Sequence, residues 1–507
     1  MRGRRPAPLR RVVTEGEVDD AGLALVLAPR HGIVLEEADG PGAYVSAAGL
    51  LGDYRRTVAA EAAGEGRHRV RQTVEYRLDL PLWGLLFRWP LRRTMGRLGG
   101  AHGVPWWAPP DRLDARSASM LGALCSLSVV VGYLGTVLTQ TITFAAKEFG
   151  AGTGAQGVAL AAVRADVVVA LVLVSMADKR GRRRVLLLSS AAGCLLTATG
   201  ALAPSLWFLA GSQVVTRGFV TAAAIVLTVA AAEEMPKGSR AYAISLLAMA
   251  AALGAGICVI LLRVADLAGG WRLLFAAGAL GLPAVRAVGR VLPESRRFRA
   301  PHGDVGMAGH GRRFWLLAVS AFLFNLFFAP ASQFGNEYLR TERGFSAARI
   351  STFTLLTATP GGIGVVVGGR LAERGRRWVG AVALVVGVGA TVLMFSVSGW
   401  LLWFWSVVGS IVGAATIPAL GVYGPELFPT SLRGKANGAI AVLGRAGSVV
   451  GLIAAGRLAA VSSFGPAMAA LAIGPVLLAA LVVARYPETA HTELEDLNPE
   501  DRPVSST

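Results

Sequence analysis

The sequence predicts an all-α membrane protein in which twelve transmembrane helices form two duplicated six-helix bundles, preceded by a cytoplasmic N-terminal extension that could be a small α+β module. Composition is the first indication. The 507 residues are 53% hydrophobic and only 16% charged, with a mean hydropathy of +0.53. A soluble protein of this length would need a more polar surface than these residues supply. The 63 glycines suit helices that pack closely within a bilayer.

A duplication is the second indication. Three polar motifs occur twice, in the same order and at nearly the same separation, so one half of the chain repeats the other. The motifs are a basic turn (178–184 and 373–377), an acid–proline–arginine pattern (Glu233, Pro236, Arg240 and Glu426, Pro429, Arg433), and a Pro-Glu-Ser or Pro-Glu-Thr sequence (293–295 and 487–489).

Twelve apolar segments between Ala118 and Arg485 are long enough to cross a bilayer, which takes about 20 residues. They lie near residues 119–143, 155–176, 185–203, 206–231, 241–263, 271–291, 314–335, 347–369, 378–398, 400–422, 435–458 and 464–485. We expect an N-terminal region over 1–115, a first bundle over 116–292, a central loop over 293–313, a second bundle over 314–486 and a tail over 487–507. No apolar stretch follows the basic start of the chain as in a cleavable signal, so the first span is the expected insertion signal.

The positions of the motifs predict the topology. All six copies follow even-numbered spans and therefore lie on one side of the membrane. Their Lys and Arg residues make that side cytoplasmic, together with both termini, in a bacterial-type plasma (inner) membrane. The net charge of +18 fits these loops and contact with anionic lipid of the bilayer, and we expect no nucleic-acid partner.

The region 1–115 is more polar than the rest. Apolar and polar residues alternate from Val70 to Leu80, which predicts a strand. Between Leu80 and Arg97, apolar and aromatic residues interspersed with arginines predict a segment lying on the cytoplasmic bilayer surface. A small α+β module carrying this segment is the expectation, and a partly disordered leader is the alternative.

From about Ala118 to Glu488 the chain resembles the major facilitator superfamily. Residues 177–184 (Ala-Asp-Lys-Arg-Gly-Arg-Arg-Arg) resemble that family's signature loop between its second and third helices. Residues 426–434 resemble the loop after the tenth helix in sugar and organic-acid carriers, and 293–295 and 487–489 resemble the sequences that end each half of sugar porters. The resemblance implies two six-helix bundles around a central cavity that works by alternating access.

The repeated motifs are the predicted cytoplasmic gate. Asp178 and Arg182 are four residues apart and can form an ion pair if the second span continues as a helix through them, and Asp178 can also face the N-terminus of the eleventh span. The acid and the arginine of each second motif could pair as well, Glu233 with Arg240 and Glu426 with Arg433. The alternative is that the basic residues only set the topology. The gate candidates are Asp178, Gly181, Arg182, Glu233, Arg240, Glu373, Arg376, Glu426 and Arg433.

Charged residues inside the predicted spans are candidates for a substrate cavity. Asp166 could carry a coupling proton, and pairing with an arginine is the alternative. Arg217 and Arg445 could face the cavity or hold helices together. The resemblance adds that Arg445 is similar to an arginine that organic-acid carriers place in that helix. Arg164 lies two residues from Asp166 and shares no helix face with it, so different partners are expected.

Uncharged polar residues form a further set of cavity candidates. Tyr133 and Gln140 share a face of the first span, while Asn325, Gln333 and Asn336 lie on or near the seventh. Their amides and hydroxyl suit hydroxyl or carboxylate ligands, and hydrogen bonding between helices is the alternative.

The predicted function is secondary active transport of a small polar organic solute, an organic acid or a sugar-like compound, by proton symport through alternating access. The expected partners are this substrate, the proton and the lipid bilayer, and the expected state is a monomer. No catalytic residue, metal site or cofactor is expected, because the sequence has no nucleophile set, metal spacing or phosphate-binding loop, so an enzyme is not predicted. Two alternatives stay open: proton-coupled efflux of amphipathic compounds, and a non-transporting solute sensor that signals through residues 1–115.

Overall fold

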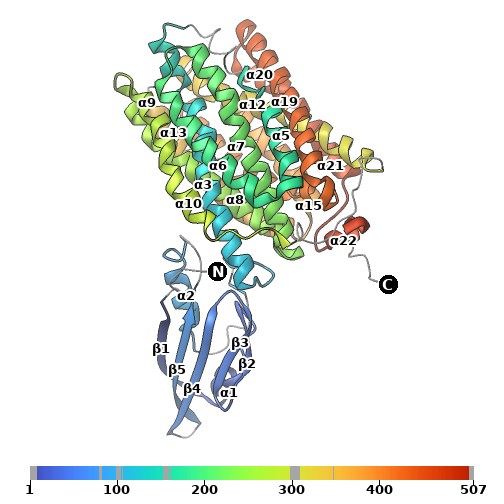
Figure 1. Cartoon of the computed structure of the whole chain (residues 1–507). Helices are drawn as coiled ribbons and strands as arrows, with labels where there is room; N and C mark the ends of the chain where they lie inside the picture. The colour runs from blue at the N-terminus through green and yellow to red at the C-terminus, as the bar shows by residue number, and fades with distance from the viewer. Residues whose placement is uncertain are drawn as a thin grey trace. The chain divides into compact units, whose positions relative to one another are not determined.

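The chain forms two compact units, Met1–Ala123 and Leu124–Thr507. The first contains a β-sheet and the second is helical (Figure 1). The computed structural model describes residues 8–64, 66–78, 83–98, 104–105, 107–151, 159, 162–296, 309–345 and 347–501.

The N-terminal unit is built on a five-stranded antiparallel sheet with the order β1-β5-β4-β3-β2 (Figure 1). The strands are β1 (Arg10–Asp19), β2 (Val34–Ala38), β3 (Ala43–Gly49), β4 (Gly52–Gly64) and β5 (Arg67–Arg77). In β5 the buried residues Val70, Val74 and Tyr76 alternate with more exposed polar neighbours. This period of two gives the sheet one apolar face.

Two short helices complete the unit. Helix α1 (Asp20–Leu27) starts at Asp19, whose carboxylate accepts a hydrogen bond from the backbone N–H of Gly22. Helix α2 (Arg88–Met95) inserts Leu91 and Met95 into the hydrophobic core formed with β5. The α+β module expected from the sequence is therefore confirmed, although residues 80–82 of the predicted surface segment lie outside the described residues.

A buried ion pair lies inside this unit. Nη2 of Arg56 is 2.6 Å from Oε2 of Glu36, and the same guanidinium donates to the carbonyls of Val26 and Ala28. Each buried charge therefore has hydrogen-bond partners, which offset the cost of removing it from water. The pKa of Tyr54 is raised because its hydroxyl is buried and lies against the Glu36 carboxylate.

The helical unit follows the predicted order of spans. Its first half consists of α3 (Ala115–Glu148), α5 (Asp166–Arg180), α6 (Arg182–Thr199), η1 (Gly200–Leu202), α7 (Leu206–Glu234), η2 (Lys237–Ser239), α8 (Arg240–Leu261), η3 (Leu262–Asp266), α9 (Gly270–Ala277), η4 (Gly278–Gly281) and α10 (Leu282–Gly289). Its second half consists of α12 (Gly311–Thr341), α13 (Ala347–Ala358), α14 (Gly361–Ala372), α15 (Arg376–Ser396), α16 (Trp400–Ala414), α17 (Thr416–Leu420), α18 (Tyr423–Glu426), α19 (Thr430–Val461), α20 (Phe464–Leu471) and α21 (Ile473–Arg485), followed by α22 (Leu494–Leu497) and η5 (Pro499–Asp501).

Within the described residues, 11 helical segments are long and apolar enough to cross a membrane. They match eleven of the twelve predicted spans in order. The other predicted span, 155–176, corresponds to α5, whose apolar part Asp166–Ala177 is shorter. Most of residues 155–161 lies outside the described part of the chain.

Glycines set the closest approaches between these helices. A Cβ atom added to Gly254 of α8 would lie 1.9 Å from the carbonyl oxygen of Val129 in α3, and one added to Gly132 would lie 2.0 Å from that of Ala251. In the second half, a Cβ on Gly364 would lie 1.7 Å from the carbonyl oxygen of Ile411. No side chain fits at these distances, so the glycines allow the backbones to touch.

Candidate functional site

The first copies of the three motifs meet at one end of the helical unit. We call it the motif end and define it as the end at which helices α5, α7, α14 and α18 terminate. Gly181 forms the turn between α5 and α6 with a φ of 100°, a value that favours glycine. The next residue, Arg182, is buried, with Nη2 at 3.1 Å from Oε1 of Glu233 at the end of α7. Oγ of Ser295 donates to the other carboxylate oxygen of Glu233 at 2.8 Å.

The second copies repeat this arrangement. Arg376, at the start of α15, is fully buried and forms an ion pair with Glu426 at the end of α18. The same guanidinium donates to Oγ1 of Thr489 at 2.8 Å. The duplication seen in the sequence is thus also a duplication of contacts.

The acid of the third motif caps a helix in each half. Oε1 of Glu294 accepts the backbone N–H of Arg183 at 3.1 Å, at the start of α6. Oε1 of Glu488 accepts the N–H of Arg376 at 3.2 Å, at the start of α15. A carboxylate at these positions satisfies free N–H groups and faces the positive end of the helix dipole.

Ion pairs also run between the two copies. Nη1 of Arg433 lies 3.3 Å from Oε1 of Glu233, and Nη1 of Arg240 lies 3.6 Å from Oε1 of Glu426. All four side chains are buried. The sequence predicted pairing within each copy, whereas these ion pairs join each acid to the arginine of the other copy. Arg182 adds a further link, because its Nη2 donates to the carbonyl of Thr430 at 3.1 Å.

Glu373 forms a further contact between the two halves. Its Oε1 accepts the backbone N–H of Ala241 at 3.1 Å, at the start of α8. Burial raises the pKa of the Glu373 carboxyl, and the charge of Arg376 opposes this shift. The same type of contact was predicted for Asp178, the counterpart of Glu373, against the eleventh span. The side chain of Asp178 lies outside the described residues, so that contact stays a prediction.

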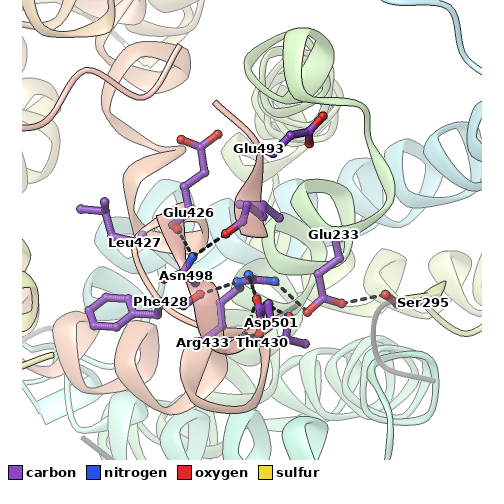
Figure 2. A network of polar contacts seen from close by, with 12 residues as sticks. Glu233, Ser295, Glu426, Leu427, Phe428, Thr430, Arg433, Glu493, Asn498 and Asp501 are labelled. Carbon is purple, nitrogen blue, oxygen red and sulfur yellow. Dashed lines mark hydrogen bonds and ion pairs between the residues drawn. The ribbon is translucent and has the colours of Figure 1, made fainter. Parts of the chain in front are cut away.

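The C-terminal tail provides residues that the sequence analysis missed (Figure 2). Oδ1 of Asp501 accepts the N–H of Thr430 at 2.8 Å, and Oδ2 lies 3.4 Å from Nη2 of Arg433. Nδ2 of Asn498, which is fully buried, donates to the carbonyl of Glu426 at 2.7 Å. Nη1 of Arg313, at the start of α12, donates to the side-chain oxygen Oδ1 of Asn498 at 3.1 Å. A carboxylate of the tail thus occupies the N-terminus of α19, the eleventh span.

A second cluster lies in the middle of the predicted spans. Nη2 of Arg445 in α19 lies 3.1 Å from Oδ2 of Asp166 in α5, so this ion pair joins the two halves. Oγ1 of Thr221 in α7 donates to the same oxygen at 2.9 Å. The side chain of Asp166 is 1% exposed and that of Arg445 is 24% exposed. The structure therefore brings together two of the predicted cavity residues, which lie far apart in the sequence.

Two more arginines surround this pair. Arg217 is one helical turn before Thr221 and shares its face of α7. Arg164 precedes Asp166 by two residues, and the charges of Arg445, Arg217 and Asp166 all act on it. Nη1 of Arg217, Nε of Arg164 and Oδ1 of Asp166 are buried without a hydrogen-bond partner within the described residues. Three guanidinium groups against one carboxylate leave positive charge that an anion would compensate.

The end opposite the motif end is hollow, and we call it the cleft end. A cavity of about 810 Å³ opens here between the two halves. Its polar lining residues are Gln140, Lys147, Glu148, Asn336, Glu337 and Arg340. Gln140 and Asn336 were both predicted as cavity residues, and they come from the first and the seventh span. The structure is therefore open at the cleft end and closed by ion pairs at the motif end.

The remaining cavity candidates make other contacts. The hydroxyl of Tyr133 donates to the carbonyl of Leu274 at 2.6 Å, and the amide oxygen of Asn325 accepts from Oγ of Ser448 at 3.3 Å. Both contacts join helices of the same half and favour the alternative of helix packing. Gln333 is partly exposed on α12, nearly one turn before Asn336.

Comparisons with known proteins agree with this architecture. The sequence matches the family model of the Major Facilitator Superfamily over residues 121–358 and 314–506. A D-xylose transporter of Levilactobacillus brevis is 28% identical over 193 residues, which are 37% of this chain and 41% of that protein. The matched region thus spans less than half of this curated relative.

Solved structures show the same fold. The proton:xylose symporter XylE superposes with a TM-score of 0.65 at 17% identity, over 76% of this chain and 99% of that chain. The human organic anion transporter MFSD10 (TETRAN) superposes with a TM-score of 0.60 at 16% identity, over 74% of this chain and all of that chain. Together with the family match, the 11 long apolar helices of the described residues and the duplicated motifs lead to one conclusion: this multi-pass membrane protein belongs to the Major Facilitator Superfamily.

Proposed function

We propose that the protein is a secondary active transporter that moves a small polar organic solute, an organic acid or a sugar-like compound, together with a proton. The observation that carries this proposal is the ion pair between Asp166 and Arg445, which lies in the middle of the predicted spans and joins the two halves. Charged side chains at this depth are costly and mark pathways for ions and substrates. The similar proteins, a D-xylose transporter, a proton:xylose symporter and an organic anion transporter, support the same class of activity.

The transport cycle is alternating access. The motif end is the cytoplasmic side of a bacterial-type inner membrane, because its loops carry the Lys and Arg residues, and both termini lie there. The protein acts as a monomer. In the present conformation the cleft end is open and the pairs of Glu233 with Arg433 and of Glu426 with Arg240 hold the motif end closed. Opening toward the cytoplasm requires these pairs to separate, which gives the two discrete states that a carrier needs.

Coupling of solute movement to proton movement follows from the charges of Asp166 and Arg445. Separating the Asp166–Arg445 pair inside the membrane leaves two uncompensated charges, at a cost of roughly 3–5 kcal/mol. A proton on Asp166 removes one charge, and a carboxylate or hydroxyl-rich solute at Arg445 compensates the other. The two halves can then separate at this level only when both ligands are bound, which is symport.

Of the two solute classes, an organic acid fits the charges of this cluster better than a sugar. Arg164 and Arg217 add two positive charges to the cluster, and Nε of Arg164 and Nη1 of Arg217 are buried without a hydrogen-bond partner within the described residues. An anionic group would satisfy these donors, whereas a neutral sugar would leave the positive charge in place.

The test is proton movement in proteoliposomes that contain a pH-sensitive dye. Organic acids, sugars including D-xylose, and cationic amphiphiles are added outside, one at a time. Internal acidification with an acid or a sugar that disappears in Arg445→Ala supports the proposal and names the solute class. Arg457→Ala is the matched control, because Arg457 is an exposed arginine of the same helix outside the cluster.

Two results would count against the proposal. Alkalinisation on adding cationic amphiphiles would indicate efflux by antiport instead of symport. An unchanged response in Arg445→Ala would show that the buried pair takes no part in coupling.

A further inference from the structure

The N-terminal unit displays apolar side chains on its surface next to arginines. Leu85, Leu86 and Trp89 are 76%, 67% and 68% exposed and lie outside the apolar core of the unit. Arg88, Arg92 and Arg93 are also exposed. We call the six residues Leu85, Leu86, Arg88, Trp89, Arg92 and Arg93 the basic-aromatic ridge.

The packing of α2 shows that the ridge is not needed for the core. Leu91 and Met95 already fill the face of α2 that meets the sheet. Trp89 lies outside that core, with its ring 5.5 Å from the guanidinium carbon of Arg93. Helix α2 therefore has apolar side chains facing its own sheet, Leu91 and Met95, and an exposed aromatic side chain, Trp89.

One hydrogen bond joins the segment that contains the ridge to the first turns of α3, the helix of the first membrane span. Nε1 of Trp83 donates to the carbonyl of Gly122 in α3 at 2.9 Å. The span itself runs from Ala115 to Ile142. Gly122 lies in the second turn of this helix, about 10 Å from its start at 1.5 Å per residue. The segment that begins at Trp83 is thus held beside the first turns of a membrane helix, where lipid headgroups lie.

The charge of this segment identifies the lipid class. Between Asp79 and Asp111 the sequence contains Arg88, Arg92, Arg93 and Arg97 and no acidic residue. Basic residues close to a membrane span are attracted to anionic headgroups, while tryptophan and leucine favour the boundary with the acyl chains. A nucleic acid would use the charges but would leave the two leucines in water.

We propose that the basic-aromatic ridge binds the bilayer surface through anionic phospholipids. Leu85, Leu86 and Trp89 enter the boundary between headgroups and acyl chains, and the arginines contact the phosphates. The ridge thereby anchors the N-terminal unit to the membrane surface. This inference does not depend on which solute the protein transports, or on whether it transports one.

Spin-label accessibility in nanodiscs tests the proposal with the full chain. Cys125, Cys194 and Cys258 are replaced, and a nitroxide is attached at Leu85→Cys or, in a second variant, at Trp89→Cys. The nanodiscs contain phosphatidylcholine alone or phosphatidylcholine with phosphatidylglycerol. We expect both labels to become accessible to oxygen and protected from a water-soluble nickel reagent when phosphatidylglycerol is present. A label at Ala59→Cys, which is exposed on β4, should stay in water in both lipids.

Charge variants distinguish lipid binding by the arginines of the ridge from a general attraction of the positively charged protein to anionic lipid. Arg92→Gln with Arg93→Gln should return the label at residue 85 to water. Arg69→Gln with Arg71→Gln removes the same charge from the exposed ion pairs of β5 with Glu17 and Glu15 and should leave the label in lipid.

Three results would overturn the proposal. A label that the nickel reagent reaches equally in both lipids would place the ridge in water. A label protected from both oxygen and nickel would place the ridge against protein, either a partner or a second copy. Immersion in phosphatidylcholine alone to the same degree would exclude a role for anionic lipid.

Discussion

Arg433 and Glu233 belong to different copies of the same motif, yet Nη1 of Arg433 lies 3.3 Å from Oε1 of Glu233. The reciprocal pair, Arg240 with Glu426, lies at 3.6 Å. Each half thus supplies the acid for one pair and the arginine for the other. An exchange of this kind allows two similar bundles to close against each other at the motif end, with every one of these charges buried.

Removal of Glu233 should open the motif end. In Glu233→Gln, Arg433 and Arg182 both lose a buried counter-charge, which should destabilise the closed state by roughly 3–5 kcal/mol. The measurement is the alkylation rate of a cysteine at Val174→Cys, a buried residue of α5 next to Gly438 of α19. We expect the rate to rise by more than about tenfold, since 1.4 kcal/mol corresponds to tenfold.

The control for this prediction is Lys237→Gln. Lys237 forms an ion pair with Glu493 in which both side chains are 45% exposed. Exposed pairs contribute about 0–1 kcal/mol, so alkylation should change little. Equal rates in Glu233→Gln and in the wild type would contradict a role of Glu233 in closure.

The tail should stabilise the start of α19. Asp501→Ala removes the acceptor of the Thr430 N–H and a counter-charge of Arg433, and loss of a helix cap costs about 0.5–2 kcal/mol. Thermal unfolding in detergent should show a lower midpoint. Glu500→Ala is the matched control, because Glu500 is an exposed neighbour that lies 3.6 Å from His310 and caps no described helix. Equal midpoints for the two variants would refute the capping role.

Glu373 should make closure depend on pH. Burial raises the pKa of this carboxyl in the closed state above the ordinary 4.5, while Arg376 and His491 lower it and Glu426 raises it. The closed state therefore binds the proton more tightly than a solvated, open state does. Acidification favours closure, and this contribution is lost as the pH rises through the raised pKa.

Alkylation of Val174→Cys, divided by the rate of the unfolded chain at each pH, measures this effect. The normalised rate should increase with pH, and Glu373→Gln should flatten the increase. Glu337→Gln, at the cleft end, should keep the pH dependence of the wild type. An unchanged pH dependence in Glu373→Gln would show that another group is responsible.

The close contact between α3 and α8 should tolerate no added methyl group. In Gly254→Ala the new Cβ would meet the carbonyl oxygen of Val129 at 1.9 Å, so α3 and α8 must move apart, at a cost of roughly 1–3 kcal/mol or more. Gly256, on the same helix, has no atom within 4 Å of such a Cβ. Gly256→Ala should be neutral or slightly stabilising, because alanine favours helix by about 1 kcal/mol over glycine. Similar unfolding midpoints for the two variants would argue against this packing.

Local patterns in the sequence were sufficient for the helices and for the duplication. Apolar length predicts a membrane span directly, and eleven of the predicted spans match long apolar helices within the described residues. The alternation around Val70 and Val74 predicted one strand, β5. The other strands of the sheet were missed because charged pairs such as Arg71 with Glu15 cover its outer face and weaken the apolar signal.

The pairing of charges required the tertiary structure. Asp166 and Arg445 are each recognisable as a charge in an apolar segment, but no local rule identifies them as partners. The exchange of ion-pair partners between the two copies at the motif end could not be predicted either, because the acid and the arginine of one copy already have a spacing that suits an ion pair with each other. Asp501 and Asn498 gave no signal, since a helix cap supplied by a distant segment leaves no local pattern.

The central claim is that solute and proton move together through the site of Asp166 and Arg445. Accumulation of a solute from the panel against its gradient, driven by an imposed pH gradient in proteoliposomes, tests it most directly in the wild type and in Asp166→Asn. We predict accumulation by the wild type, and in Asp166→Asn a loss of accumulation with exchange of labelled for unlabelled solute retained. Accumulation by Asp166→Asn at the wild-type level would contradict the claim.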